Sequence, residues 1–147
     1  MTNIFTYGTL MFTELVFALT GNRFQSMDAF IDNYIRYKVT TENSNEEYPA
    51  IIEKSGSNVK GKVLFDIDDD SLKIIDFYEG DEYKRIIKPI SLSDKTQMEV
   101  FVYVWNHEYS LAKQLNWDVD MFKTNHLKYY LNHVIPSVKN DYYSINC

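Results

Sequence analysis

Two short segments that lie far apart in the sequence constrain this chain more than any other feature. The first, residues 5–10 (Phe-Thr-Tyr-Gly-Thr-Leu), is typical of a strand that ends in a glycine turn. The second, residues 72–85, starts as a short apolar helix and carries the carboxylate of Glu79 at its end. Together they indicate a turn of backbone N–H groups that faces a partly buried glutamate. Such a site suits a small anionic substrate on which one proton is moved, so the sequence favours a small-molecule enzyme.

The rest of the chain is typical of a β-rich core. Aromatic residues make up 16% of the sequence, and their flat rings cover a pleated sheet well. Gly61 interrupts one strand, which indicates either a bulge or a close approach of another backbone. A Ser-Gly-Ser turn is expected within residues 54–58. The expected strands cover residues 3–7, 29–40, 48–52, 59–67, 83–92 and 97–105, and the last two should form an antiparallel pair.

Three helices are expected between and after these strands. The first covers residues 12–19 and ends at a Thr-Gly pair. The second runs through Tyr78, with its N-cap within residues 68–71 and Gly80 just beyond its end. A terminal helix over residues 118–135 should stop at Pro136. The pattern predicts an α+β fold, a small mixed or antiparallel β-barrel with flanking helices. We expect one domain over residues 1–147, with its core at about 1–105 and a helical tail at about 106–147.

Glu79 is the candidate catalytic residue. At 100° per residue it shares one face of its helix with Leu72, Ile75 and Asp76. Because the two apolar residues should point at the core, this face carries the carboxylate inward. Lost hydration raises the pKa of a carboxylate and suits it to accept and return a proton near neutral pH. The alternative is an ordinary exposed glutamate at a fraying helix end. Asp76 could cap the helix or pair with Arg85.

The turn formed by Tyr7, Gly8, Thr9 and Leu10 is the other half of the expected site. Its glycine lets the backbone approach a ligand closely, and consecutive amides in such a turn can form an anion-binding concavity. A helix that begins near Phe12 would add a favourable dipole for a carboxylate. By itself a Tyr-Gly-Thr tripeptide is more often a plain turn, and this alternative stays open.

Composition excludes several other classes of function. The formal net charge of −6 and the pI of about 5.0 lack the basic footprint of a nucleic-acid-binding protein. No window approaches the roughly 18 apolar residues that cross a bilayer, and the N-terminus shows no signal-peptide pattern. The single cysteine, Cys147, cannot form an intrachain disulfide, so we expect a reducing, cytoplasmic location. The three histidines, His107, His126 and His133, lack metal-ligand spacing, so no metal is expected.

Four motifs follow one another along the chain. They are Tyr7-Gly8-Thr9-Leu10, Tyr48-Pro49-Ala50, Val59-Lys60-Gly61-Lys62-Val63 and a Leu-x-x-x-Asp-x-Tyr-Glu-Gly-x-x-Tyr-x-Arg block from Leu72 to Arg85. In this order and spacing they resemble the gamma-glutamylcyclotransferase-like superfamily, especially its gamma-glutamylamine cyclotransferase branch. The resemblance covers about residues 3–105, whereas the stretch from 106 to 147 matches only loosely.

The resemblance implies both a site and a reaction. Glu79 would be the general acid/base, and the backbone from Tyr7 to Leu10 would hold the α-carboxylate and amine of a γ-glutamyl group. In the family reaction the substrate's own α-amine attacks its γ-carbonyl, which gives 5-oxoproline and a released amine or amino acid. No metal or cofactor is required. The Tyr-Gly-Thr-Leu form differs from the Tyr-Gly-Ser variants of the glutathione-acting branches, so glutathione is the less expected substrate.

Two other hypotheses remain open at this point. One is a non-catalytic module that captures an amino-acid-like ligand in the same pocket. The other is a structural or interaction protein whose terminal aromatic helix, within residues 118–147, docks a partner. For the leading hypothesis we expect a small-molecule γ-glutamyl substrate, neither nucleic acid nor membrane as partner, and a monomer or homodimer.

Overall fold

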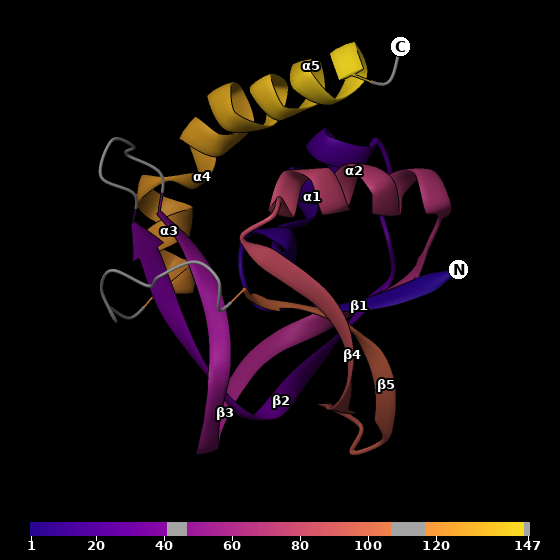
Figure 1. The fold of residues 1–147 in the computed structure, drawn as a ribbon, viewed down its shortest axis with the longest axis vertical. Coiled ribbons are helices and arrows are strands. Elements are labelled where there is room, and N and C mark those ends of the chain that lie inside the picture. Colours follow the sequence, from indigo (N-terminus) through magenta and orange to yellow (C-terminus); the bar gives the residue numbers. More distant parts are fainter. Residues whose placement is uncertain (41–46, 107–116, 146–147) are drawn as a thin grey trace.

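The computed structural model describes residues 1–40, 47–106 and 117–145, and its centre is a closed β-barrel (Figure 1). The strand order around the barrel is β1-β3-β2-β4-β5. Strands β1 and β5 run parallel, and the other neighbouring pairs are antiparallel. The predicted α+β fold with a small mixed barrel is therefore confirmed. The strands are β1 (Thr2–Thr6), β2 (Ser26–Thr40), β3 (Glu47–Ile67), β4 (Tyr83–Leu92) and β5 (Gln97–Trp105).

Alternation along the strands divides the core into two clusters, because successive side chains point to opposite faces of a strand. Phe5 pairs with Val63 and Val102 on the neighbouring strands, and all three belong to a cluster contributed by the barrel strands. The preceding residue, Ile4, pairs with Leu64, and both belong to the cluster shared with the helices. Strand β1 is thus covered on both faces, which fixes the position of the loop that follows it.

Gly61 marks a close approach of two backbones. It lies opposite Ala29 in an unbroken stretch of the β2–β3 register, so the bulge alternative does not apply. A Cβ atom at this position would collide with the carbonyl oxygen of Thr6 and lie 3.0 Å from Cζ of Phe5. Only glycine lets β1 lie this close to β3.

The predicted Ser-Gly-Ser turn is wrong, because β3 runs without interruption from residue 47 to residue 67. Between the paired positions Asp32–Asn58 and Tyr34–Glu53 the register shifts, and residues 54–57 are accommodated opposite Asn33 alone. Asn33 and Gly56 both have left-handed backbone there (φ +65° and +84°), and the Gly56 N–H donates to Asn33 Oδ1 at 3.2 Å. The glycine signal therefore reflects an enlarged bulge, with four residues opposite one, that bends the strand without ending it.

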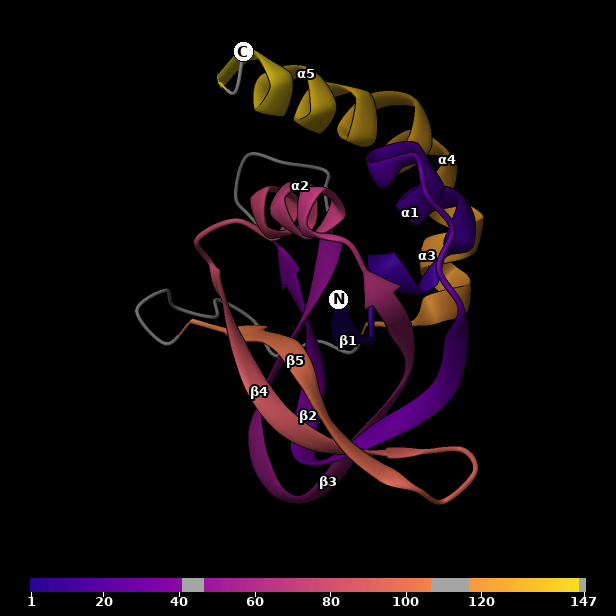
Figure 2. The ribbon, with the colours of Figure 1, turned by 90° about the vertical axis from the view of Figure 1, so that its right-hand side faces the viewer.

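The first helices have the predicted ends. Helix α1 (Thr13–Thr20) stops at Gly21, whose φ of +76° is left-handed, and α2 (Asp69–Glu79) starts after Asp68, whose side chain accepts from the Ser71 N–H at 3.1 Å. Helices α1 and α2 pack with α5 (Ile135–Ile145) at one end of the barrel (Figures 1 and 2). Within the described ranges no helix combines the length and apolar character needed to span a membrane.

The prediction that the terminal helix stops at Pro136 is wrong. The chain forms α3 (Val119–Asn125), α4 (Leu127–Tyr129) and a π-helical turn η2 (Tyr130–Val134), and it then continues through Pro136 into α5. Proline lacks an N–H and its ring crowds the carbonyl four residues earlier, so the wider π turn just before it accommodates it. The buried residues of this tail join the same cluster as α1 and α2; they are Trp117, Phe122, Leu127, Tyr130 and Ile135.

Candidate active site

A cavity of about 370 Å³ lies where the end of β1, the end of α2 and the C-terminal helices meet. This volume is within the range of small-molecule sites. Both halves of the predicted site line it, namely Glu79 and the loop Tyr7–Leu10. The other lining residues are Phe5, Thr6, Pro49, Tyr78, Glu82, Tyr83, Tyr103, Tyr129, Tyr130, His133, Val134, Ser137 and Val138.

Side-chain hydrogen bonds hold the Tyr7–Leu10 loop. Tyr7 is buried, and its hydroxyl donates to the carbonyl oxygen of Tyr103 at 2.5 Å. Burial, and next the negative charge of Glu79, raise the pKa of Tyr7 well above its usual value, so it remains a neutral donor. Thr9 Oγ1 and the Tyr78 hydroxyl are 2.7 Å apart. The loop is therefore tied to β5 on one side and to α2 on the other.

The backbone of the same loop leaves two N–H groups outside the hydrogen bonding of the helix that follows it. Gly8 backs onto Pro49, because a Cβ at residue 8 would collide with Cγ of the proline. The short helix η1 (Thr9–Met11) follows, and its first hydrogen bond runs from the Met11 N–H to the Gly8 carbonyl at 3.0 Å. The N–H groups of Thr9 and Leu10 precede this bond, so the helix geometry itself gives them no acceptor.

Glu79 is the last residue of α2, and Gly80 with φ +77° turns the chain away directly after it. The side chain is half-buried and lines the cavity, so the alternative of an ordinary exposed glutamate is not what the structure contains. Burial, and next the negative charge of Asp76, raise the pKa of Glu79 to about 8. A carboxyl group with this pKa can exchange a proton close to neutral pH. Its catalytic role stays a prediction.

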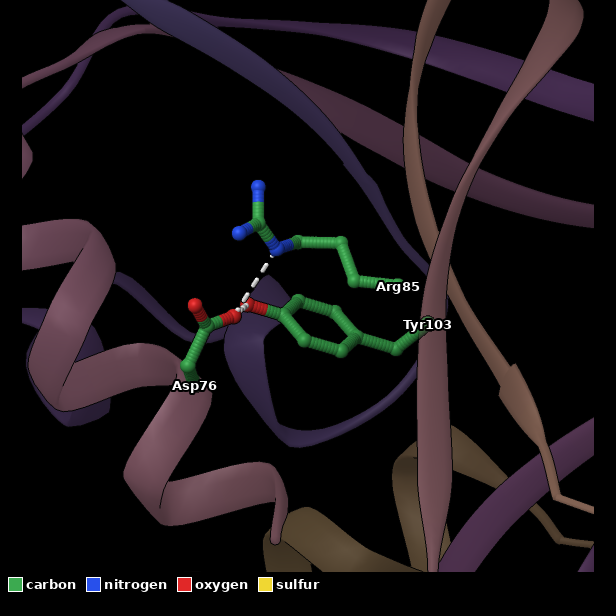
Figure 3. Close-up of polar contacts among 3 residues, drawn as sticks. All are labelled: Asp76, Arg85 and Tyr103. Carbon is green, nitrogen blue, oxygen red and sulfur yellow. Dashed lines mark hydrogen bonds and ion pairs between the residues drawn. The ribbon is translucent and has the colours of Figure 1, made fainter. Parts of the chain in front are cut away.

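Asp76 lies one helical turn before Glu79 and is held by two donors (Figure 3). Its Oδ1 accepts from the Tyr103 hydroxyl at 2.5 Å and pairs with Arg85 Nε at 3.0 Å, so of the two alternatives for Asp76 the structure shows the pair with Arg85. The Arg85 guanidinium also lies over the ring of Phe101, 4.6 Å from its centroid. Burial, and next the hydrogen bond to Asp76, raise the pKa of Tyr103. The network joins β4 and β5 to α2 beside the candidate acid.

Changing Asp76 to asparagine should lower the pKa of Glu79. The variant removes a neighbouring negative charge and keeps an oxygen that can accept from Tyr103. Because burial is the larger cause of the shift, the pKa should fall from about 8 yet stay above the ordinary glutamate value of 4.5. Titration of the glutamate side-chain carboxyl carbons by NMR measures it. Asp70→Asn, at the exposed start of α2, is the control that should leave it unchanged. An unmoved Glu79 titration in Asp76→Asn would contradict the stated cause.

Sequence reasoning does not find the wall of the cavity that the C-terminal helices provide. Tyr130 is buried there, Tyr129 is 48% exposed, and its ring lies 4.9 Å from that of His133. His133 is exposed at the surface and also lines the cavity. The apolar stripe of this segment signals that one face is covered, yet nothing in its spacing says that the face meets a pocket. Tyr83 also lines the cavity, and its hydroxyl donates to the Pro49 carbonyl at 2.6 Å.

The cavity is thus lined by the Tyr7–Leu10 loop, by several tyrosines and by a carboxyl group that titrates near neutrality. Within residues 1–40, 47–106 and 117–145, no cluster of three or more His, Cys, Asp or Glu side chains could hold a metal ion. His107 and Cys147 lie outside these ranges. The arrangement can bind a small molecule that carries a carboxylate and can move protons on it.

Comparisons with known proteins bear on the family and the fold. The family model described as gamma-glutamyl cyclotransferase, AIG2-like, matches residues 4–120. AIG2-like protein D from Arabidopsis thaliana is 31% identical over 133 residues, which cover 89% of this chain and 85% of that protein. A solution structure from Arabidopsis thaliana superposes with a TM-score of 0.69 at 24% identity, covering 89% of this chain and 86% of its own. A structure named gamma-glutamyl cyclotransferase has a TM-score of 0.62 at 17% identity, covering 71% and 66%. At these identities the two structures support the fold alone.

Proposed function

The chain belongs to the gamma-glutamyl cyclotransferase, AIG2-like, family, and we propose that it releases 5-oxoproline from a γ-glutamyl amine or a γ-glutamyl amino acid. One observation carries the proposal. Glu79, with a pKa raised to about 8, and the Tyr7–Leu10 loop line the same small cavity. The loop would hold the α-carboxylate and the α-amine, and Glu79 would move protons between the two nitrogens.

The reaction balances with one carboxylate and no other reactant. The α-nitrogen attacks the γ-carbonyl carbon, the ring C–N bond forms and the original amide C–N bond breaks. The attacking nitrogen, which starts as an ammonium, loses two protons overall, and the leaving nitrogen gains two. Glu79 accepts a proton from the first nitrogen and returns it to the second, and it does so twice. Proton transfer of this kind contributes about 10²–10⁴-fold to a rate.

The raised pKa of Glu79 fits this sequence of steps. Without ligand, a carboxyl group with a pKa of about 8 is mostly protonated at pH 7. An arriving α-ammonium group favours the carboxylate form, because an opposite charge nearby lowers the pKa of an acid. Substrate binding would thus generate the base beside the group it deprotonates. Folding the γ-glutamyl chain inside the cavity adds a proximity effect, since ring closure needs the amine near the carbonyl.

The test is 5-oxoproline release from a panel of γ-glutamyl amines, γ-glutamyl amino acids and glutathione. The proposal expects release from at least one γ-glutamyl amine or amino acid, together with an equal amount of free amine or amino acid. A folded protein that releases no 5-oxoproline from any member contradicts it. If 5-oxoproline nevertheless raises the melting temperature of that inactive protein, a non-catalytic binding module becomes the better account.

A further inference from the structure

Arg36 contacts the substrate loop but is not one of the described residues that line the cavity. It lies on β2, opposite Ile51 of β3, and its side chain is half-buried. Its Nη1 donates to the carbonyl oxygen of Tyr7 at 2.7 Å. Its guanidinium carbon lies 5.2 Å from the centroid of the Trp117 ring. The cation is therefore held between the loop and the start of the C-terminal segment.

The partly buried position of the Arg36 guanidinium costs desolvation free energy. Burial lowers the pKa of Arg36, although the charge of the neighbouring Asp118 opposes the shift. A partly buried cation is retained where it makes a strong interaction, and a charge-assisted hydrogen bond to a carbonyl is roughly twice as strong as a neutral one. The bonded carbonyl belongs to the peptide that joins Tyr7 to Gly8. Arg36 therefore acts on the backbone of the loop and not on a side chain.

The hydrogen bond from Arg36 also fixes the direction of the Gly8 N–H, because this N–H and the Tyr7 carbonyl belong to one peptide group. In a trans peptide the C=O and N–H groups point in opposite directions, and the described residues contain no cis peptide. With the Tyr7 carbonyl directed at Arg36, the Gly8 N–H is directed away from it. Gly8 is itself a lining residue of the cavity. A positive charge at the carbonyl also polarises the peptide, which makes its N–H a better donor to an anion.

We propose that Arg36 is a positioning residue of the substrate site, which fixes the Tyr7–Gly8 peptide so that the Gly8 N–H is offered to the α-carboxylate of the γ-glutamyl group. The identity of that ligand rests on the proposed function. Arg36 itself does not touch the substrate. Its effect should fall on binding more than on the chemical step, because the α-carboxylate takes no part in bond making or breaking.

The test compares Arg36→Met, Arg36→Lys and Lys60→Met with the unchanged protein. Methionine keeps an apolar stem beside Trp117 but removes the donor, lysine restores a charged donor, and Lys60 is an exposed β3 residue that controls for net charge. For each we would measure the dissociation constant of 5-oxoproline by calorimetry, and kcat and KM with the best panel substrate. Melting temperatures establish that each variant is folded.

In Arg36→Met the dissociation constant and KM should rise by about 10- to 100-fold with kcat changed by less than about threefold. Arg36→Lys should recover part of this loss, and Lys60→Met should match the unchanged protein. A folded Arg36→Met variant that binds 5-oxoproline as tightly as the unchanged protein overturns the positioning role and leaves the proposed function intact. Conversely, tight 5-oxoproline binding that depends on Arg36 in a protein without turnover supports the role while the proposed function fails. If the unchanged protein neither binds nor turns over, both are overturned.

Discussion

Replacing Glu79 with glutamine should lower kcat for 5-oxoproline release by about 10²–10⁴-fold, the contribution of a positioned general acid/base. Glutamine has almost the same shape as glutamate, but its amide cannot take a proton from one nitrogen and return it to another. KM should change far less, because the substrate carboxylate is assigned to the Tyr7–Leu10 loop. Steady-state kinetics with the best panel substrate measure both constants. Glu99→Gln, an exposed carboxylate on β5, is the matched control and should keep normal turnover.

The same variant should change how stability depends on pH. The pKa of Glu79 is about 8 in the folded protein against 4.5 for an ordinary glutamate. Between these values the folded state keeps a proton that the unfolded state has lost, so stability falls as pH rises from about 4.5 to about 8. Glu79→Gln lacks this loss and should be more stable than the unchanged protein at pH 9, by about 1–3 kcal/mol for a half-buried group. The difference should shrink toward pH 5. Urea denaturation of both proteins at pH 5 and pH 9 measures this difference in unfolding free energy. If the two proteins were equally stable at both pH values, the burial of this carboxyl would be contradicted.

Changing Gly61 to alanine should destabilise the protein by at least about 3 kcal/mol, at the upper end of the cost of overpacking a core. The added Cβ would collide with the Thr6 carbonyl oxygen, which is backbone and cannot rotate away as a side chain would. Strand β1 would have to move away from β3 and would shift the Tyr7–Leu10 loop that follows it. We therefore expect a lower urea midpoint and, in the folded fraction, weaker 5-oxoproline binding.

Gly56→Ala is the control for this prediction, because it introduces the same methyl group elsewhere on β3. A Cβ at residue 56 would meet no atom within 4 Å, but its φ of +84° is unfavourable for alanine. Its cost should be only the backbone penalty of about 1–2 kcal/mol. If Gly61→Ala proved no more destabilising than Gly56→Ala, the close packing of β1 on β3 would be wrong.

Much of the fold could be predicted because its signals are local. The caps of α2 at Asp68 and Gly80, the end of α1 at Gly21 and the β4–β5 pair each depend on a few adjacent residues. The two errors, at residues 54–58 and at Pro136, have a common cause. Glycine and proline change the backbone locally, but whether the chain then ends its element or continues through a bulge or a π turn is decided by packing against distant segments.

Only part of the candidate site, likewise, could be predicted from the sequence. Glu79 and the Tyr7–Leu10 loop could be found because helix periodicity and a glycine turn mark them individually. The contributions of Tyr103, Tyr130 and His133 could not, because each reaches the cavity only through the closure of the barrel and the path of the C-terminal helices. The aromatic excess of the sequence is consistent with these residues but does not distinguish a cavity wall from a core.

The pH dependence of kcat/KM tests most directly whether Glu79 is the group that moves the protons. We would measure it from about pH 6 to pH 10 for the unchanged protein and for Asp76→Asn, with the best panel substrate. With Glu79 as that group, we expect kcat/KM to show a limb that rises through an apparent pKa of about 8 and moves to lower pH in Asp76→Asn. The substrate's own amine would give a limb that the variant leaves in place. A profile that is flat over this range, or a limb at the same pH in both proteins, would show that Glu79 is not that group.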